Sequence, residues 1–228
     1  MKPARGFEQA LRVESSERLA VIAEVKRRSP SKGSLNADLD PAVMAHSYEA
    51  AGATCLSVLT DEPHFGGSVS DLRAARAACA LPVLRKDFTV SSRDVCDARI
   101  MGADCVLLIA AALERGELVE LHELAVSIGL DVLVEIHDEV ELEVATLAEA
   151  SLIGVNQRDL VTFKVDHERA VRMAGIIPKA AVRVAESGVR DGADAQSLRA
   201  AGYDAVLVGE SLVTSSDIAA SLGSLRAP

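Results

Sequence analysis

The sequence predicts a single α/β domain folded as a (β/α)8 barrel, and two observations support this prediction. Eight short runs rich in β-branched and other apolar residues recur along the 228 residues, and segments with helical spacing separate them. The runs are continuously apolar rather than alternating, as expected of parallel strands that are covered on both faces. The alternative is an open doubly wound sheet, which usually carries a Gly-rich phosphate loop after its first strand. The sequence has no such loop there, so we favour the closed barrel.

The expected strands follow one another at regular intervals. In order they are LAVIAEV (19–25), TCLSVL (54–59), LPVLRK (81–86), DCVLLIA (104–110), DVLVEI (131–136), SLIGVN (151–156), AVRVAES (181–187) and DAVLVGE (204–210). Nothing between them resembles a linker. We therefore divide the chain only into a short N-terminal segment, residues 1–18, and the barrel, residues 19–228.

Capping residues mark several of the helices between these strands. Asp40 followed by Pro41 predicts a helix that starts with an aspartate N-cap and a proline in its first turn. Ser68, with Asp71 three residues later, has the pattern of a capping box. Glycines just before three of the strands predict helix ends, since glycine tolerates the left-handed conformation found there. These glycines are Gly52, Gly102 and Gly202.

The composition limits the class of function. A net charge of −10 argues against nonspecific binding of nucleic acid, which depends on Lys and Arg. The sequence has no apolar stretch of the length that spans a membrane and no signal-peptide pattern, so we expect a cytoplasmic protein without membrane contact. The histidines form no metal-binding motif, and we expect no metal and no cofactor. The cysteines lack CxxC spacing, and we expect small buried thiols in a reducing compartment. They are Cys55, Cys79, Cys96 and Cys105.

Charged and polar residues collect at the carboxyl ends of the expected strands, where a barrel builds its active site. Glu24 and Lys26 end the first strand and should share one face, because side chains alternate along a strand. A single charge such as Glu135 would be ordinary, but five strands bring opposed charges to one rim, a grouping that supports proton transfer. The residues at this rim are Glu24, Lys26, Lys86, Glu135, Asn156, Arg158, Glu186 and Ser187. The amino ends carry aspartates that we expect to be turn residues, Asp104, Asp131 and Asp204.

Glycines after the last two strands indicate a phosphate site. Gly188 in ESGVR and Gly209 in VGESLV would let backbone N–H groups approach an anion beside a short extra helix. An ordinary turn explains either glycine alone, but two in the expected places favour phosphate. Ser29 could close the site, and Lys26 would add positive charge. Glu210 fits only if its side chain points away while its N–H points in.

Six motifs at these strand ends resemble, in order and spacing, those of the indole-3-glycerol-phosphate synthase family of tryptophan biosynthesis. They are AEVKRRSPSKG, PVLRKDF, LVEIH, IGVNQRDL, VAESGV and VLVGESL. The resemblance runs from about residue 5 to the C-terminus. It implies a TIM barrel that acts as a carboxy-lyase on a small anionic phosphosugar. The enzyme would close the ring of 1-(2-carboxyphenylamino)-1-deoxyribulose 5-phosphate, losing carbon dioxide and water, without a cofactor or metal.

The resemblance also implies roles for individual residues. Lys86 resembles the general acid that protonates the carbonyl oxygen of the substrate, and Glu135 resembles the acid/base that assists dehydration. Lys26 resembles a lysine that holds or protonates the substrate, with Glu24 as its partner. The other implied residues are Asn156, Glu186 and Ser187 for the substrate hydroxyls and the developing positive nitrogen; Ser29, Gly188, Gly209, Glu210 and Arg158 for phosphate; and Phe65, Phe88, Leu108 and Leu160 for the aromatic ring.

Three departures from the family pattern stand out. The family often has a longer segment before the first strand, forming a helix over the barrel mouth, so we expect RGFEQALR to be the remainder of a shortened lid. Gln157 replaces the commoner Asn, and Glu210 stands where many members have Ser.

Two other functions remain open at this point. One is another phosphosugar barrel, such as a phosphoribosylanthranilate isomerase-like enzyme, which would be expected to carry a Cys or Asp acid/base pair at strands one and five. The other is a non-catalytic paralogue that binds an anionic ligand or a partner subunit. For the assembly we expect a monomer or a weak homo-oligomer.

Overall fold

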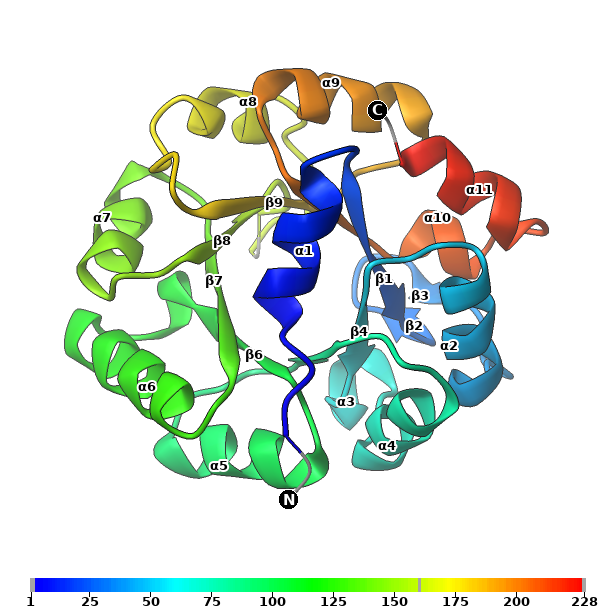
Figure 1. Cartoon of the computed structure of the whole chain (residues 1–228), viewed down its shortest axis with the longest axis horizontal. Coiled ribbons are helices and arrows are strands. Elements are labelled where there is room, and N and C mark those ends of the chain that lie inside the picture. Colours follow the sequence, from blue (N-terminus) through cyan, green and yellow to red (C-terminus); the bar gives the residue numbers. More distant parts are fainter. Residues whose placement is uncertain (1–2, 160, 227–228) are drawn as a thin grey trace.

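The computed structural model describes residues 3–159 and 161–226, and it confirms the (β/α)8 barrel as a single domain (Figure 1). Eight parallel strands close on themselves, with β1 hydrogen-bonded to both β4 and β10. The barrel strands are β1 (Ala20–Val25), β4 (Cys55–Leu59), β5 (Val83–Lys86), β6 (Cys105–Ile109), β7 (Asp131–Ile136), β8 (Leu152–Asn156), β9 (Val182–Glu186) and β10 (Ala205–Val208). Each lies within one of the eight predicted runs.

Helices surround the barrel, and a two-stranded hairpin follows β1. The hairpin consists of β2 (Arg28–Ser29) and β3 (Gly33–Ser34). The helices are α1 (Phe7–Ser15), α2 (Pro41–Ala50), α3 (Glu62–Phe65), α4 (Val69–Ala78), α5 (Ser92–Met101), η1 (Ala110–Ala112), α6 (Arg115–Ser127), α7 (Glu139–Leu147), α8 (Arg169–Ala174), α9 (Gly192–Ala201), α10 (Glu210–Val213) and α11 (Ile218–Leu225).

The predicted helix caps are present. The Asp40 side chain accepts hydrogen bonds from the backbone N–H groups of Ala42 and Val43, which starts α2. Gly102 and Gly202 end α5 and α9 with φ angles of 102° and 101°, in the left-handed region. These caps fix where α2 begins and where α5 and α9 end before the next strand.

Two apolar layers hold the barrel. The larger one fills the space between the outer face of the sheet and the helices. The smaller one fills the inside of the barrel and contains inward residues such as Ile22, Leu107 and Leu133. Because side chains alternate along each strand, the inward positions above this inner layer are left for the polar residues of the carboxyl ends.

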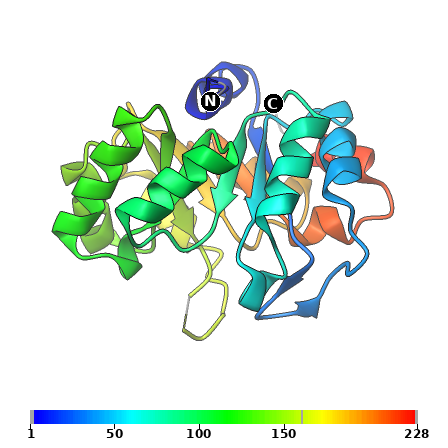
Figure 2. The same cartoon turned by 90° about the horizontal axis from the view of Figure 1, so that it is seen from below.

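Helix α1 closes the amino end of the barrel, and the prediction that this segment is the remainder of a lid over the mouth is wrong. Phe7 and Leu11 are fully buried in the inner apolar layer. The backbone N–H of Glu8 donates to Asp131 at 2.9 Å, which fastens the helix to β7. Figure 2 shows α1 at one end of the barrel, with the β2–β3 hairpin and the β8–α8 loop at the other. The fully apolar face of α1 can be buried only against the apolar end of the barrel interior.

The aspartates at the amino ends do more than form turns. Asp104 is fully buried, forms an ion pair with Arg76 at 2.6 Å and accepts from the backbone N–H of Val83 at 2.9 Å. Asp204 accepts from the backbone N–H of Arg183 at 2.9 Å. These carboxylates bond to backbone groups of the neighbouring strand, so they stabilise the closed end of the barrel.

Cys55, Cys79 and Cys105 are buried and unpaired, as predicted, but Cys96 is exposed on α5. Cys96 lies on the outward face of α5, and the sequence pattern alone does not distinguish the outward face of this helix from its buried face. None of the helices in residues 3–159 and 161–226 is long and apolar enough to cross a membrane.

Candidate active site

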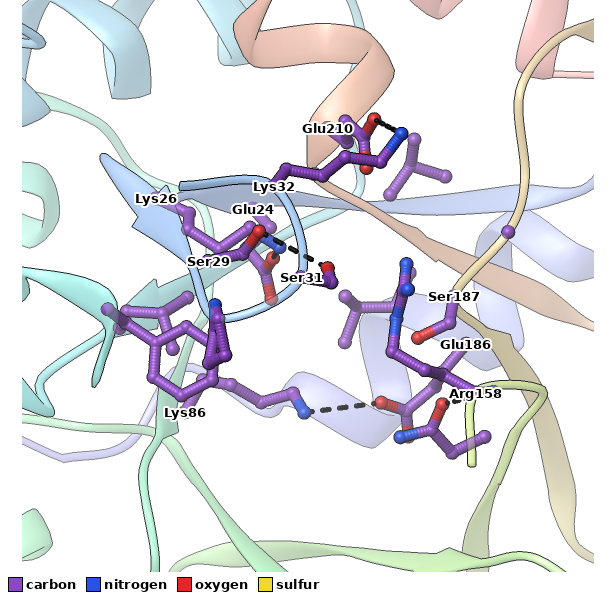
Figure 3. A pocket seen from close by; sticks show the side chains of 18 of the residues that line it. Glu24, Lys26, Ser29, Ser31, Lys32, Lys86, Arg158, Glu186, Ser187 and Glu210 are labelled. Atoms are coloured by element: carbon purple, nitrogen blue, oxygen red, sulfur yellow. Dashed lines mark hydrogen bonds and ion pairs between the residues drawn. The ribbon is translucent and has the colours of Figure 1, made fainter. Parts of the chain in front are cut away.

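A cavity of about 430 Å³ opens at the carboxyl ends of the strands. It brings together nearly all of the residues predicted from the sequence, although they come from segments far apart in the chain (Figure 3). The predicted residues that line it are Glu24, Lys26, Ser29, Phe65, Lys86, Phe88, Glu135, Asn156, Arg158, Glu186, Ser187, Gly188, Gly209 and Glu210.

Lys86 lies between two buried carboxylates at the centre of the cavity floor. Its Nζ is 3.1 Å from Glu135 Oε2 and 3.5 Å from Glu186 Oε2. The amide of Asn156 donates to the other oxygen of Glu135, Oε1, at 2.9 Å. Glu135 and Glu186 are each 1% exposed, so these contacts are made away from bulk water.

The strand register explains how these groups meet. Asn156 in β8 is paired with Glu186 in β9, and Glu135 in β7 is paired with Gly154 in β8. Gly154 has no side chain, and the carboxylate of Glu186 occupies the space that a side chain there would need. Both carboxylates can then turn toward Lys86 across the barrel.

Electrostatics set the charge states of Lys86 and Glu135. Burial alone would lower the pKa of Lys86, but Glu135, Glu186 and Glu24 together outweigh it and raise that pKa above its ordinary value. Burial alone would raise the pKa of Glu135, but Lys86, the hydrogen bond from Asn156 and the nearby His137 lower it below its ordinary value. The resting site therefore contains an ammonium paired with an ionised carboxylate.

Glu186 behaves differently from Glu135 although both contact the same lysine. Burial raises the pKa of Glu186 to about 8, with Lys86 opposing the shift and Glu135 adding to it. Its Oε1 is buried and has no hydrogen-bond partner among the described residues. Two carboxylates beside one ammonium cannot both ionise easily, so at neutral pH Glu186 retains its proton. An acid and a base thus lie side by side.

Glu24 and Lys26 share one face of β1, as predicted, and form an ion pair of 2.5 Å. Ser57, the register partner of Glu24 in β4, donates its hydroxyl to Glu24 Oε2 at 3.3 Å. The buried hydroxyl of Tyr48 donates to the backbone oxygen of Glu24 at 3.2 Å. These contacts fix the end of β1, so that Lys26 is held at the wall of the cavity.

The predicted phosphate end of the cavity consists of the two loops that follow β9 and β10. Ser187 and Gly188 take consecutive left-handed conformations, with φ angles of 64° and 76°. The short extra helix expected after the last strand is present as α10, and Gly209 is its N-cap. The side chain of Glu210 turns to Lys32 in the β2–β3 hairpin, with Nζ and Oε1 3.4 Å apart (Figure 3). The carboxylate is thus engaged by a cation from the facing loop.

Arg158 belongs to the β8–α8 loop and is partly used within it. Its Nη1 donates to the backbone oxygen of Phe163 at 3.1 Å, and the two arms of the loop are joined by a bridge between Arg158 and Val165. Phe163 and Val165 also line the cavity. The loop therefore forms a wall of the mouth, and Arg158 both shapes this wall and faces the opening.

Two of the four candidates for an aromatic ring pocket line the cavity, Phe65 and Phe88. Leu108 does not, and its prediction is wrong. It points outward into the layer between the sheet and the helices, whereas its neighbours Leu107 and Ile109 point inward and line the cavity. The error is one residue in register, which reverses the face of a strand side chain. Leu160 lies outside the described residues.

Sequence reasoning missed residues whose roles depend on local geometry. Gln157 is 2% exposed, and its side-chain amide donates to the backbone oxygen of Ser187 at 2.7 Å, so it ties the β8 and β9 loops together. His137 lies 3.9 Å from Glu135. Period-two alternation could have found His137, because it shares a face with Glu135 two residues earlier. No pattern in the sequence indicates that Gln157 has a different role from an ordinary loop residue.

Within the described residues no cluster of three or more His, Cys, Asp or Glu side chains is arranged to hold a metal ion.

Comparison with known proteins gives a consistent result. The family model described as indole-3-glycerol phosphate synthase matches residues 1–225. An indole-3-glycerol phosphate synthase of Streptomyces griseus subsp. griseus is 54% identical over 211 residues, covering 92% of this chain and 78% of the relative. One from Parafrankia sp. is 51% identical over 208 residues, covering 91% and 78%. Among solved structures, 3-hexulose-6-phosphate synthase from Salmonella typhimurium superposes with a TM-score of 0.72 over 91% of this chain and 96% of that one. Its identity is 14%, so this likeness concerns the fold alone.

Proposed function

The chain belongs to the indole-3-glycerol phosphate synthase family, and we propose that its cavity closes the ring of 1-(2-carboxyphenylamino)-1-deoxyribulose 5-phosphate with loss of carbon dioxide and water. The protein is then a carboxy-lyase of tryptophan biosynthesis. The observation that carries the proposal is the contact of Lys86 with both Glu135 and Glu186 at the floor of the one cavity that holds the family's motif residues. A ring closure followed by dehydration needs a general acid next to a group that can accept a proton, and this arrangement supplies both.

Proton balance defines what the site must do. The substrate loses an ionised carboxylate as neutral carbon dioxide, so each turnover takes up one proton from solvent. Within the cycle one proton goes to the ketone oxygen, a second goes to the hydroxyl that leaves as water, and one is removed from the ring carbon during dehydration. The site therefore has to donate protons twice and accept one once.

Lys86 is the general acid of ring closure in this proposal. The attack of an arene carbon on a ketone is slow unless the oxygen gains a proton as the bond forms. The raised pKa of Lys86 keeps it in the ammonium form at neutral pH. It therefore gives up its proton only as negative charge develops on the ketone oxygen. General acid catalysis of this type contributes a factor of about 10²–10⁴.

Glu135 assists the dehydration step. It is ionised beside Lys86 and can accept the proton that leaves the ring carbon, and Lys86 is near enough to share it. Asn156 holds the other carboxylate oxygen, which fixes the direction in which Glu135 can accept. Glu186 and Ser187 line the cavity and are candidates to bind the substrate hydroxyls and to face the nitrogen on which positive charge develops.

Lys26 and Glu24 act together at the wall of the cavity. Lys26 carries the second ammonium of the site, which suits the carboxylate of the substrate, and Glu24 holds it at 2.5 Å. When the substrate enters, Lys26 can pair with the substrate carboxylate as well as with Glu24. This would orient the carboxyphenyl end before ring closure.

The phosphate group of the substrate fits the side of the cavity formed by the loops after β9 and β10. The left-handed backbone at Ser187 and Gly188, Gly209, the backbone N–H of Glu210 and the hydroxyl of Ser29 face this end. Lys32 and Arg158 add positive charge at the rim. Backbone N–H groups at a loop and at the start of a short helix are suited to a phosphate.

The aromatic ring of the substrate requires an apolar wall. Phe65 and Phe88 line the cavity, and so do Leu107 and Ile109, which belong to the inner apolar layer of the barrel. These apolar side chains support the proposal that the ring binds in the same cavity as Lys86.

We further propose that the protein acts in the cytoplasm as a monomer or weak homo-oligomer. The buried, unpaired thiols of Cys55, Cys79 and Cys105 suit a reducing compartment. We also propose that residues 1–18 form a short N-terminal segment and that residues 19–228 form the barrel domain.

Turnover of the carboxyphenylamino-deoxyribulose phosphate, followed by the rise of indole fluorescence, tests the function. The wild-type protein should form indole-3-glycerol phosphate. Absence of product, with the substrate still bound, would favour the non-catalytic paralogue. Activity on a phosphoribosyl-amine isomerase substrate instead would favour the other phosphosugar barrel.

A further inference from the structure

His137 is a buried side chain that the proposed mechanism leaves unused. It follows Glu135 by two residues, is 11% exposed at its side chain, and is not among the residues that line the cavity. Its Nε2 lies 3.9 Å from Glu135 Oε1 and has no hydrogen-bond partner among the described residues. An imidazole nitrogen left open in a buried position, and facing a carboxylate, needs an explanation.

Glu141 fixes the other side of the ring. Its Oε2 is 3.0 Å from His137 Nδ1 and also accepts the backbone N–H of His137 at 2.7 Å. Glu141 belongs to the first turn of α7, where the side chain of Asp138 caps its backbone N–H at 2.9 Å. The Glu141 side chain is 18% exposed, more than that of Glu135 at 1%. Glu141, His137 and Glu135 thus form a row from the outer helix to the cavity floor.

The reaction creates a need for such a row. This inference rests on the proposed function, in which each turnover takes up one proton while the substrate fills the mouth of the cavity. Lys86 must regain a proton, and its neighbours Glu135 and Glu186 are buried. A path that enters from the side of α7 would reach Glu135 without passing the bound substrate.

We propose that His137 is a positioning residue that passes a proton from Glu141 to Glu135 and so recharges Lys86. In this step Glu141 first takes a proton from water, Nδ1 takes that proton, Nε2 gives its own proton to the Glu135 carboxylate, and Glu135 transfers it to Lys86. The imidazole is then protonated on Nδ1, and a rotation of the ring returns the N–H to the side of Glu135 before the next turnover. Charge is balanced, because Glu141 becomes ionised as Lys86 becomes ammonium, and Glu141 then exchanges with water. The gap of 3.9 Å is longer than a hydrogen bond, so transfer requires the two groups to approach or one water to bridge them.

The groups that face this row come from four elements. Lys86 of β5, Asn156 of β8 and Glu186 of β9 face Glu135, and Glu141 of α7 faces His137. None of the first three contacts His137 directly in an ion pair or hydrogen bond of the described structure. Replacing His137 therefore leaves the contacts of Lys86 and Asn156 with Glu135 in place.

The kinetic test uses His137→Ala with and without added imidazole. We expect kcat to fall on the order of 10-fold with KM changed less than about threefold, and to rise again as imidazole is added. His137→Gln, which fills the same space, should show the same fall. Glu141→Gln should lower kcat as well, while its amide oxygen can still accept the backbone N–H of residue 137. His46→Ala is the matched control, because His46 is exposed on α2, and its kcat should not change.

A purely structural role gives a different pattern. A kcat within threefold of wild type in both His137 variants would overturn the proposal. So would a fall in kcat that imidazole does not restore and that leaves the shape of the pH profile unchanged.

A second readout does not depend on turnover. Carboxyl carbon NMR of protein labelled at the glutamate side chains follows the ionisation of Glu135. His137 is one of the groups that lower the pKa of Glu135, so in His137→Ala the titration of Glu135 should move to higher pH. An unchanged titration would overturn the coupling. Absence of product from the wild-type protein would contradict the proposed function and would leave this result to judge the coupling by itself.

Discussion

The carboxylate of Glu186 in β9 occupies the space beside Gly154 in β8 that a side chain at position 154 would need. A β-carbon built on Gly154 would overlap Oε1 of that carboxylate. The φ angle of Gly154 is not in the left-handed region. Glycine is therefore required at this position because a side chain would not fit, and not because of the backbone conformation. The closeness of Glu186 to Lys86 therefore depends on a residue that has no side chain of its own.

Gly154→Ala should displace Glu186 and lower kcat at least about 10-fold, because Glu186 can no longer reach Lys86. The buried overlap should also destabilise the fold by about 1–3 kcal/mol. Steady-state kinetics and urea unfolding measure the two effects. Gly116→Ala is the matched control, since a β-carbon at Gly116 meets nothing within 4 Å. It should leave kcat unchanged and, because Gly116 lies in α6, should stabilise the fold by no more than about 1 kcal/mol. Full activity of Gly154→Ala would show that the position of Glu186 is not needed.

Lys86→Ala and Glu135→Gln should each reduce turnover at least about 10²-fold with the fold preserved, because each removes a proton-transfer group. Lys86→Ala leaves two buried carboxylates without their cation, so its circular dichroism and unfolding curve must be recorded beside the kinetics. Unchanged turnover in either variant would remove that residue from the mechanism.

Glu186 should make the stability of the protein depend on pH. Burial raises its pKa from 4.5 to about 8, so the folded protein holds this proton more tightly than the unfolded chain does. The stabilisation is fully present below about pH 4.5 and is lost as the pH rises through about 8. The lowered pKa of Glu135 acts in a different window, below its ordinary value of 4.5.

Urea unfolding at several pH values between those limits tests this. The free energy of unfolding of the wild type should fall with rising pH more steeply than that of Glu186→Gln, which cannot titrate. Parallel curves for the two proteins would contradict the assignment.

The sequence predicted the barrel and the rim because both depend on repeating patterns. Apolar runs at regular spacing mark the strands, and a polar residue at the end of each run is enough to place Glu24, Lys86, Glu135 and Glu186 at one rim. The convergence itself follows from barrel closure, since the carboxyl ends of all strands meet at one end.

The incorrect predictions, and the residues that were missed, depend on information that a pattern of residues along the chain does not contain. The resemblance implies Leu108 at the aromatic ring, and the sequence cannot correct this, because a run of five apolar residues gives no alternation from which to read the register. The prediction that the N-terminal helix lies at the mouth rests on the family resemblance, and the sequence of the helix shows an apolar face without showing which end of the barrel that face covers. Gln157 and His137 act through single contacts that exist only after folding.

Glu210→Gln should tighten substrate binding. The carboxylate lies beside the predicted phosphate site and holds Lys32 at 3.4 Å, although both side chains are about half exposed. Removing its charge frees Lys32 for the phosphate and removes a repulsion, so KM should fall about two- to threefold at low ionic strength. The difference should shrink at high salt, and kcat should not change.

Lys32→Gln should raise KM in the same assay, and Glu120→Gln, exposed on α6, is the control that changes only the net charge. A KM that rises in Glu210→Gln would indicate that the carboxylate contacts the substrate directly.

Helix α1 should act as a plug of the amino end of the barrel and not as a lid over the mouth. Leu11 is fully buried inside the amino end of the barrel, so Leu11→Ala should destabilise the fold by about 2–5 kcal/mol. Val13, on the same helix and 62% exposed, is the matched control, and Val13→Ala should cost no more than about 0.5 kcal/mol. Because α1 lies at the amino end of the barrel and the cavity opens at the carboxyl end, KM of Leu11→Ala measured well below its unfolding temperature should equal that of the wild type. A raised KM with an unchanged unfolding curve would mean that the segment acts at the mouth after all.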